Sequence, residues 1–228
     1  WLKQQDPNIL TAVRVRDDVE GIMVSRGTLN INKNYTVPKR RALALIQHEI
    51  GTHVVTYYNG KAQPLKLFYI GVPGYEQLQE GLAVFSEYLC GGLTNERLRI
   101  LAARVVAVNH MISGNSFVDT FFLLTDKHQF TPETAFHVTM RVYRGGGLTK
   151  DAVYLKGLLN LLEYIKQGKE LAPLLIGKIR QDYIPVINEL TFRGLLAKIP
   201  ITPRYLSAPY LKPMNNIKKG GNIFSMLN

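Results

Sequence analysis

Cysteine and long apolar runs are nearly absent from this sequence, and each absence excludes a class of protein. Cys90 is the only cysteine in 228 residues, so no disulfide can form within the chain and a hydrophobic core has to stabilise the fold. No stretch approaches the roughly 18 uninterrupted apolar residues of a membrane span, and residues 1–10 lack the charged and apolar regions of a signal peptide. We therefore expect a globular protein without a membrane span, in a reducing compartment such as the cytoplasm.

Acidic residues are also scarce. The chain has 17 Asp and Glu against 28 Lys and Arg, which gives a formal net charge of +11 at pH 7. Such a surface attracts acidic partners, among them acidic polypeptides, anionic membranes and nucleic acids. The sequence contains no recognisable nucleic-acid-binding motif and no basic stripe interleaved with aromatic residues, so nucleic acid is the less favoured partner.

Hydrophobic periodicity predicts a small N-terminal β-sheet followed by a helical remainder. Residues 12–36 combine β-branched residues, alternation and turn formers, which is typical of strands. From Pro38 onward the spacing of apolar residues becomes helical. The predicted helices cover residues 39–58, 76–89, 95–112, 117–126, 132–144, 150–167 and 170–198. We expect an α+β fold, mostly α, with a single domain over residues 1–200 and an extended C-terminal tail over residues 201–228 that packs on it or trails from it.

The stretch HEIGTH, residues 48–53, resembles a zinc-protease motif with one residue too many. In the usual H-E-x-x-H pattern, two histidines one helical turn apart bind the metal and the glutamate between them acts as general base. Here His53 follows His48 by five residues. On an α-helix, side chains five residues apart point about 140° away from each other, whereas side chains four residues apart differ by only about 40°. Either the match is accidental and His53 faces solvent or core, or the helix is widened by a π-bulge, which we expect at Gly51.

The helix predicted over residues 76–89 offers the third ligand of such a site. Zinc proteases of the glutamate-ligand class place two histidines and a base on one helix and complete the site with a glutamate from a later helix. Glu80 lies near the start of this helix, and Gly81 beside it would let the backbone pass close to the HEIGTH helix. Glu87 lies two turns further along a similar face. We favour Glu80 as ligand, with Glu87 as the alternative ligand or as a partner for a histidine N–H.

HEIGTH together with QEGLA, residues 79–83, resembles the flavohemoglobin expression-modulating QEGLA-motif family, which is related to the microtubule-associated tyrosine carboxypeptidases. The resemblance covers most of the chain. It implies a zinc metallopeptidase of gluzincin-like fold, with His48, His53 and Glu80 as Zn²⁺ ligands and Glu49 as base. Characterised eukaryotic members remove a C-terminal tyrosine from tubulin tails. The implied function is a carboxypeptidase that removes C-terminal residues, tyrosine among them, from a peptide or protein tail that could be acidic.

The segment from Thr131 to Gly157 contains candidates for the remaining groups of such a site. A tetrahedral oxyanion needs a hydrogen-bond donor, and an exopeptidase needs a cation for the terminal carboxylate. Arginine binds carboxylates in a bidentate manner, and a tyrosine hydroxyl is a suitable oxyanion donor. The candidates are Arg141, Arg144 and Lys150 for substrate binding and Tyr154 for catalysis. The arginines are also compatible with a solvated face or with pairing to acidic neighbours, and Tyr154 is also compatible with a scaffold role.

Two further features bear on function. The strand segment GIMVSRGTLNIN precedes the HEIGTH helix, and an edge strand at this place could receive the substrate by β-addition. The alternative function is a catalytically inactive or regulatory binding module on the same fold, associated with nucleic acid because of the net charge. The presence of both histidines, Glu49 and Glu80 favours the enzyme.

Overall fold

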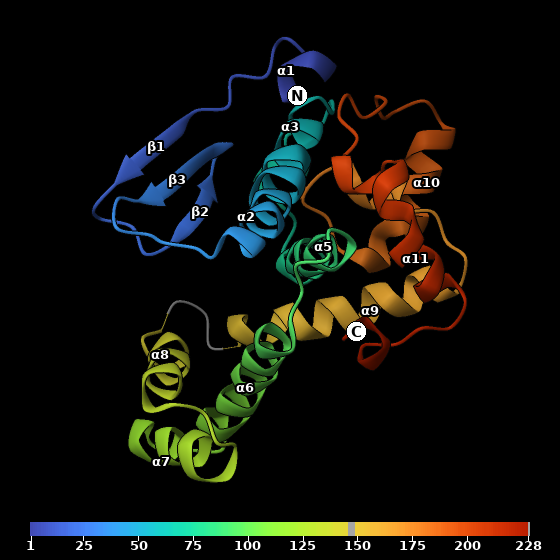
Figure 1. Cartoon of the computed structure of the whole chain (residues 1–228). Coiled ribbons are helices and arrows are strands. Elements are labelled where there is room, and N and C mark those ends of the chain that lie inside the picture. The colour runs from blue at the N-terminus through green and yellow to red at the C-terminus, as the bar shows by residue number, and fades with distance from the viewer. Residues whose placement is uncertain (146–148, 228) are drawn as a thin grey trace.

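The computed structural model describes residues 1–145 and 149–227. A small sheet lies beside a larger helical body (Figure 1). The sheet has three strands in the order β1-β3-β2, and β3 pairs parallel with β1 and antiparallel with β2. A tight turn at Arg26 and Gly27, both with positive φ, joins β2 to β3. The strands are β1 (Val13–Arg16), β2 (Ile22–Ser25) and β3 (Thr28–Asn32). The predicted N-terminal sheet is confirmed.

One continuous helical segment follows the sheet and contains HEIGTH. It begins as an α-helix after Pro38, changes to a π-helix, and returns to α geometry. Its three parts are α2 (Lys39–Ile46), η1 (Gln47–Val54) and α3 (Val55–Lys61). The short helices α1 (Leu2–Gln5) and α4 (Leu67–Ile70) flank this part of the chain. Figure 1 shows the sheet on one side of this segment and the C-terminal helices on the other.

The centre of the molecule is the crossing of α5 (Glu76–Leu89) and α9 (Val153–Lys166). The two backbones approach so closely at Gly81 and Gly157 that a Cβ on Gly81 would lie 2.4 Å from the carbonyl carbon of Gly157. We predicted that Gly81 lies against the HEIGTH helix, and this was wrong, because Gly81 contacts α9. The crossing anchors the main hydrophobic core, to which Leu82, Phe85, Leu158, Leu161 and Ile165 contribute.

The helices between α5 and α9 extend from the body and enclose a second, smaller core (Figure 1). The hydroxyl of Thr94 caps the first of them, and the hydroxyl of Thr131 caps the last. They are α6 (Asn95–Ile112), α7 (Phe117–Phe122), η2 (Leu123–Lys127) and α8 (Pro132–Tyr143), and η3 (Lys150–Ala152) leads from them into α9. All of them lie within or close to the predicted ranges, so the mostly helical fold class is confirmed. The gluzincin-like topology stays a prediction.

The predictions for the C-terminal part were wrong in two respects. The helix predicted over residues 170–198 is broken, because prolines start new short helices and Gly177 packs against the backbone of Phe68, where a side chain would not fit. The predicted extended tail instead contains helices, since its apolar residues pack into the main core. The elements of this part are η4 (Ala172–Leu175), η5 (Gln181–Tyr183), α10 (Ile184–Phe192), η6 (Arg204–Leu206), η7 (Ala208–Tyr210), α11 (Leu211–Lys218) and η8 (Phe224–Met226). Residue 228 lies outside the described residues. Among those described, no helix combines the length and the apolar character needed to cross a bilayer.

Candidate metal centre

The two histidines of HEIGTH lie on one face of the helix because the helix is widened. Residues Gln47–Val54 form a π-helix, in which the hydrogen bond runs from residue i to i+5 and side chains five apart face the same way. The imidazole rings of His48 and His53 have centroids 5.2 Å apart and an interplanar angle of 77°. The prediction that HEIGTH departs from α geometry is confirmed.

Side chains behind the π-helix hold its widened turn. The Thr52 hydroxyl donates to the Gln47 carbonyl, five residues earlier, at 3.2 Å. Gly51 leaves room for two buried neighbours, because a Cβ there would lie 2.6 Å from Gln47 Oε1 and 3.3 Å from Cδ1 of Tyr205. Tyr205, from the C-terminal segment, is 1% exposed and fills the space behind the helix. The widened turn is therefore supported by local hydrogen bonding and by a distant part of the chain.

Glu80 completes a group of three side chains that could hold a metal ion. Oε2 of Glu80 lies 3.7 Å from Nε2 of His48 and 3.8 Å from Nε2 of His53, and the three ligand atoms are all within 4.8 Å of one another. A tetrahedral ion with ligands at about 2.1 Å separates them by about 3.4 Å, which is close to these distances. Glu80 Oε2 is buried and has no hydrogen-bond partner among the described residues. Burial of an unpaired carboxylate oxygen is costly, and a cation at this position would remove the cost.

Glu87 lies behind His48 and orients its ring. Its Oε1 is 2.9 Å from Nδ1 of His48, and the carboxylate also forms ion pairs with Arg41 at 2.8 Å and Arg97 at 3.1 Å. Burial alone would raise the pKa of Glu87, but Arg97, His48 and Arg41 outweigh it and hold the pKa well below its usual range. The anion accepts a hydrogen bond from Nδ1–H and thereby orients the ring of His48. The lone pair is then on Nε2, the atom that faces Glu80. Glu87 is therefore a partner of a histidine N–H, which is one of the two alternatives that the sequence offered for it. The glutamate of the candidate metal group is Glu80.

Burial shifts the pKa of two groups in this site. It lowers the pKa of His53 to about 4, so the ring is neutral at pH 7 and can offer a lone pair to a cation. It raises the pKa of Glu49 to about 7, against the attraction of His48. Oε1 of Glu49 is 3.9 Å from Nε2 of His48, so this carboxylate lies beside the ligand group without belonging to it.

The site opens into a pocket of about 710 Å³. Strand β2 is an edge strand of the sheet and contributes Ile22, Met23 and Val24 to the wall. Four tyrosines, Tyr35, Tyr57, Tyr75 and Tyr154, add aromatic surface. The remaining wall is rich in cations, which are Arg26, Arg41, Arg97, Arg104, Arg141, Arg144, Lys150 and Lys178. The pocket therefore combines an acidic and imidazole-bearing group with a predominantly cationic wall.

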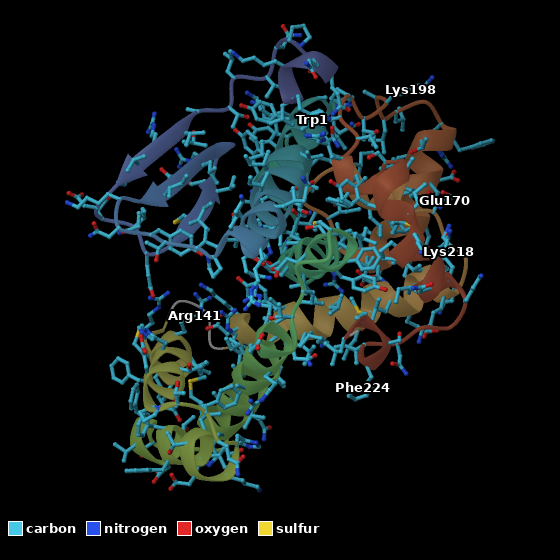
Figure 2. All side chains as sticks on the ribbon, in the orientation of Figure 1. Trp1, Arg141, Glu170, Lys198, Lys218 and Phe224 are labelled. Atoms are coloured by element: carbon cyan, nitrogen blue, oxygen red, sulfur yellow. The ribbon has the colours of Figure 1, made fainter. Side chains whose placement is uncertain are left out.

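The structure brings the four remaining predicted residues to this pocket, in different settings. Tyr154 is half-buried near the start of α9, and burial together with Glu80 raises the pKa of its hydroxyl, so the hydroxyl keeps its proton at neutral pH. Arg141 lies at the end of α8 that faces the body of the molecule, as Figure 2 shows, and its Nη2 is 2.8 Å from Oδ1 of Asp151. Arg144 pairs with Glu20 at 2.5 Å on the surface, and Lys150 is exposed at the pocket rim.

Arg104 is a pocket residue that the sequence interpretation missed. It lies on α6, where Leu101, Ala107 and Val108 form a buried stripe, and it occupies a position on that stripe with 9% exposure. Its guanidinium stacks over the ring of Tyr154 at 5.1 Å. A charged residue at an apolar position of the helical pattern was the signal available in the sequence.

Comparison with known proteins identifies the family of the chain. No individual curated protein is similar enough to the chain to be matched. The model of the family described as microtubule-associated tyrosine carboxypeptidase (MATCAP) matches residues 2–220, which include the whole candidate metal centre and its pocket. The chain therefore belongs to the microtubule-associated tyrosine carboxypeptidase family.

Proposed function

We propose that the protein is a zinc-dependent carboxypeptidase that removes C-terminal residues, tyrosine among them, from polypeptide tails. The observation that carries this proposal is the group of His48, His53 and Glu80 at 3.7–3.8 Å spacing, with Glu49 beside it in a cationic pocket. The family supports the carboxypeptidase activity. The tail of tubulin is the substrate that the family name suggests, and a microtubule-associated enzyme would act in the cytoplasm.

Zinc fits this donor set better than other common ions. Two imidazoles and one carboxylate are the ligands of many catalytic zinc sites, and three protein ligands leave a coordination position for water or substrate. When bound, the ion would supply a Lewis acid for the peptide carbonyl and lower the pKa of water towards about 7. The unpaired Oε2 of Glu80 and the neutral ring of His53 match what such an ion needs.

Glu49 is positioned to move the proton in hydrolysis. It follows His48 on the π-helix, lies close to the ligand group and lines the pocket. In the proposed mechanism its carboxylate takes a proton from the attacking water and passes it to the amine that leaves. The hydroxyl of Tyr154, protonated at neutral pH, donates to the oxyanion that develops on the peptide carbonyl.

The pocket wall offers places for the rest of the substrate. Strand β2 is an edge strand of the sheet and lines the pocket, so an extended peptide can add to the sheet beside the reacting bond. The cations Arg141, Arg144 and Lys150 line the same pocket and favour an acidic tail.

The test uses a zinc assay and matched peptides. His53→Ala should abolish stoichiometric zinc, whereas Glu49→Gln should keep zinc and lower kcat by about 100- to 10,000-fold, because Glu49 acts on water and is not a ligand. The unmodified protein should cleave free-acid peptides and leave C-terminally amidated ones largely intact. Full zinc in His53→Ala would refute the ligand set. Equal cleavage of acids and amides would refute the exopeptidase assignment, and a zinc-bound protein without any hydrolysis would favour the binding module.

A further inference from the structure

Arg104 is a buried cation that forms no ion pair in the part of the chain that the structure describes. It is 9% exposed, and its Nε is buried without a hydrogen-bond partner among residues 1–145 and 149–227. Four of the five other arginines of the pocket have carboxylates: Arg41 and Arg97 pair with Glu87, Arg141 with Asp151 and Arg144 with Glu20, whereas Arg26 is exposed to solvent. The guanidinium of Arg104 takes part in no ion pair within the described part of the chain, and it lies over the face of the Tyr154 ring.

Such a group is unfavourable unless an anion binds to it. Removal of a guanidinium from water without hydrogen-bonded compensation is strongly unfavourable. Burial, together with repulsion from Arg141 and Arg97, lowers the pKa of Arg104 to about 10, so it still carries its charge at pH 7. A stacked tyrosine ring offsets only part of this cost.

Arg141 also has a buried N–H donor without a partner in the described structure. Its Nη2 pairs with Asp151, and the donor without a partner is its Nε. Arg104 and Arg141 come from two helices that pack together, α6 and α8. The charge of Arg141 contributes to the lowered pKa of Arg104. Two neighbouring guanidinium groups with unused N–H donors favour a planar anion that accepts from both.

The position of this pair relates it to the candidate metal centre. Both arginines line the pocket that contains Glu80, and Tyr154, whose ring Arg104 stacks over, lines the same pocket. The geometry points to Arg104, with Arg141 beside it, as the residue that binds the C-terminal carboxylate of the substrate. This inference rests on the proposed carboxypeptidase function. It assigns to Arg104 the main role in recognition of a free acid, whereas Arg144 is already neutralised by Glu20.

The kinetic test compares free-acid and amidated peptides of the same sequence with the zinc-loaded protein. Arg104→Gln should lower kcat/KM for the free acid by about 10- to 100-fold, the value of a lost charged hydrogen-bond pair, and change any residual cleavage of the amide by less than about twofold. Arg104→Lys keeps the charge and loses the bidentate fork, so it should recover only part of the activity. The control is Arg99→Gln, which removes an exposed cation from the same helix outside the pocket.

A binding test keeps the outcome separate from hydrolysis. Calorimetry should show that N-acetyl-tyrosine binds the zinc-loaded protein at least about tenfold more tightly than its amide, and that Arg104→Gln removes this difference while zinc content stays stoichiometric. Inorganic phosphate serves as a second probe: binding of phosphate that Arg104→Gln abolishes, with no preference for acid over amide, would assign the site to a free anion and overturn the inference.

Further outcomes are also decisive. If no peptide is hydrolysed but the acid-over-amide preference in binding depends on Arg104, the proposed function fails and the carboxylate site stands. If Arg104→Gln does not fold, Arg104→Lys carries the comparison. Should both variants, or the folded one, keep the full preference for the free acid, Arg104 is a structural residue stacked on Tyr154 and the inference is wrong.

Discussion

Gly81→Ala tests how strongly the crossing of α5 and α9 positions the candidate metal centre. In an ordinary helix interior this substitution stabilises by about 1 kcal/mol, because alanine has the higher helix propensity. Here the new Cβ would lie 2.4 Å from the carbonyl carbon and 2.5 Å from the carbonyl oxygen of Gly157, and 2.9 Å from the amide nitrogen of Leu158. All three atoms belong to the backbone, so no side chain can rotate away. The helices must separate by about 1 Å to restore normal contact.

The expected change in stability follows from these distances. Overpacking of a core costs about 1–3 kcal/mol, and a backbone clash belongs at the upper end of that range. After the gain in helix propensity, we expect a net loss of about 2 kcal/mol, which corresponds to a fall in Tm of about 4–8 °C for a chain of this size. Because Glu80 precedes Gly81 on the same helix, the shift should also weaken zinc binding by about tenfold or more.

Calorimetric melting and zinc competition with a chelator measure the two effects. Gly60→Ala is the matched control, since its Cβ would lie 2.4 Å from the backbone oxygen of Phe68, at a contact outside the candidate metal group. It should lower Tm and leave zinc affinity unchanged. The reasoning is refuted if Gly81→Ala melts at or above the Tm of the unmodified protein. Equal loss of zinc affinity in both variants would refute the specific link between the crossing and Glu80.

Three further predictions follow from single contacts. Glu87→Gln should keep the shape of the side chain but weaken zinc binding by about 10- to 100-fold in chelator competition, because the anion that orients His48 is lost; unchanged affinity would contradict its role. Burial raises the pKa of the Cys90 thiol to about 11, so at pH 8 a thiol reagent should react about 100-fold more slowly with native than with unfolded protein, and equal rates would show an accessible thiolate. Deletion of residues 201–228 should yield an unfolded or aggregated chain by circular dichroism, since Tyr205 and its apolar neighbours leave the main core; a stable, zinc-binding product would show that residues 1–200 fold alone.

The local geometry of the metal helix was predictable because it depends on one angle. The spacing of His48 and His53 requires a widened turn if both are to meet one ion, and no distant residue enters that argument. The length of the π-helix was not predictable in this way. It extends over eight residues, and Tyr205, far away in sequence, packs behind it.

The roles of the two glutamates could not be separated from sequence. Glu80 and Glu87 lie two helical turns apart on one face, so both are candidates for the same ion. Their difference comes from Arg41 and Arg97, which surround Glu87 with positive charge and leave Oε2 of Glu80 unpaired. This distinction depends on tertiary contacts between α2, α5 and α6, which a spacing rule does not contain.

The net charge of the chain acquires meaning only through the arrangement of the pocket. Eight cations line it against five acids, and four of the arginines pair with carboxylates. Arg26 and Lys150 are exposed, so salt screens their attraction for an acidic tail, with a Debye length of about 10 Å at 0.1 M salt. Arg104 is buried, and salt screens a buried charge much less. Added salt should therefore reduce the preference for acidic tails and leave the preference for a free C-terminal carboxylate, because the two depend on different cations of one pocket.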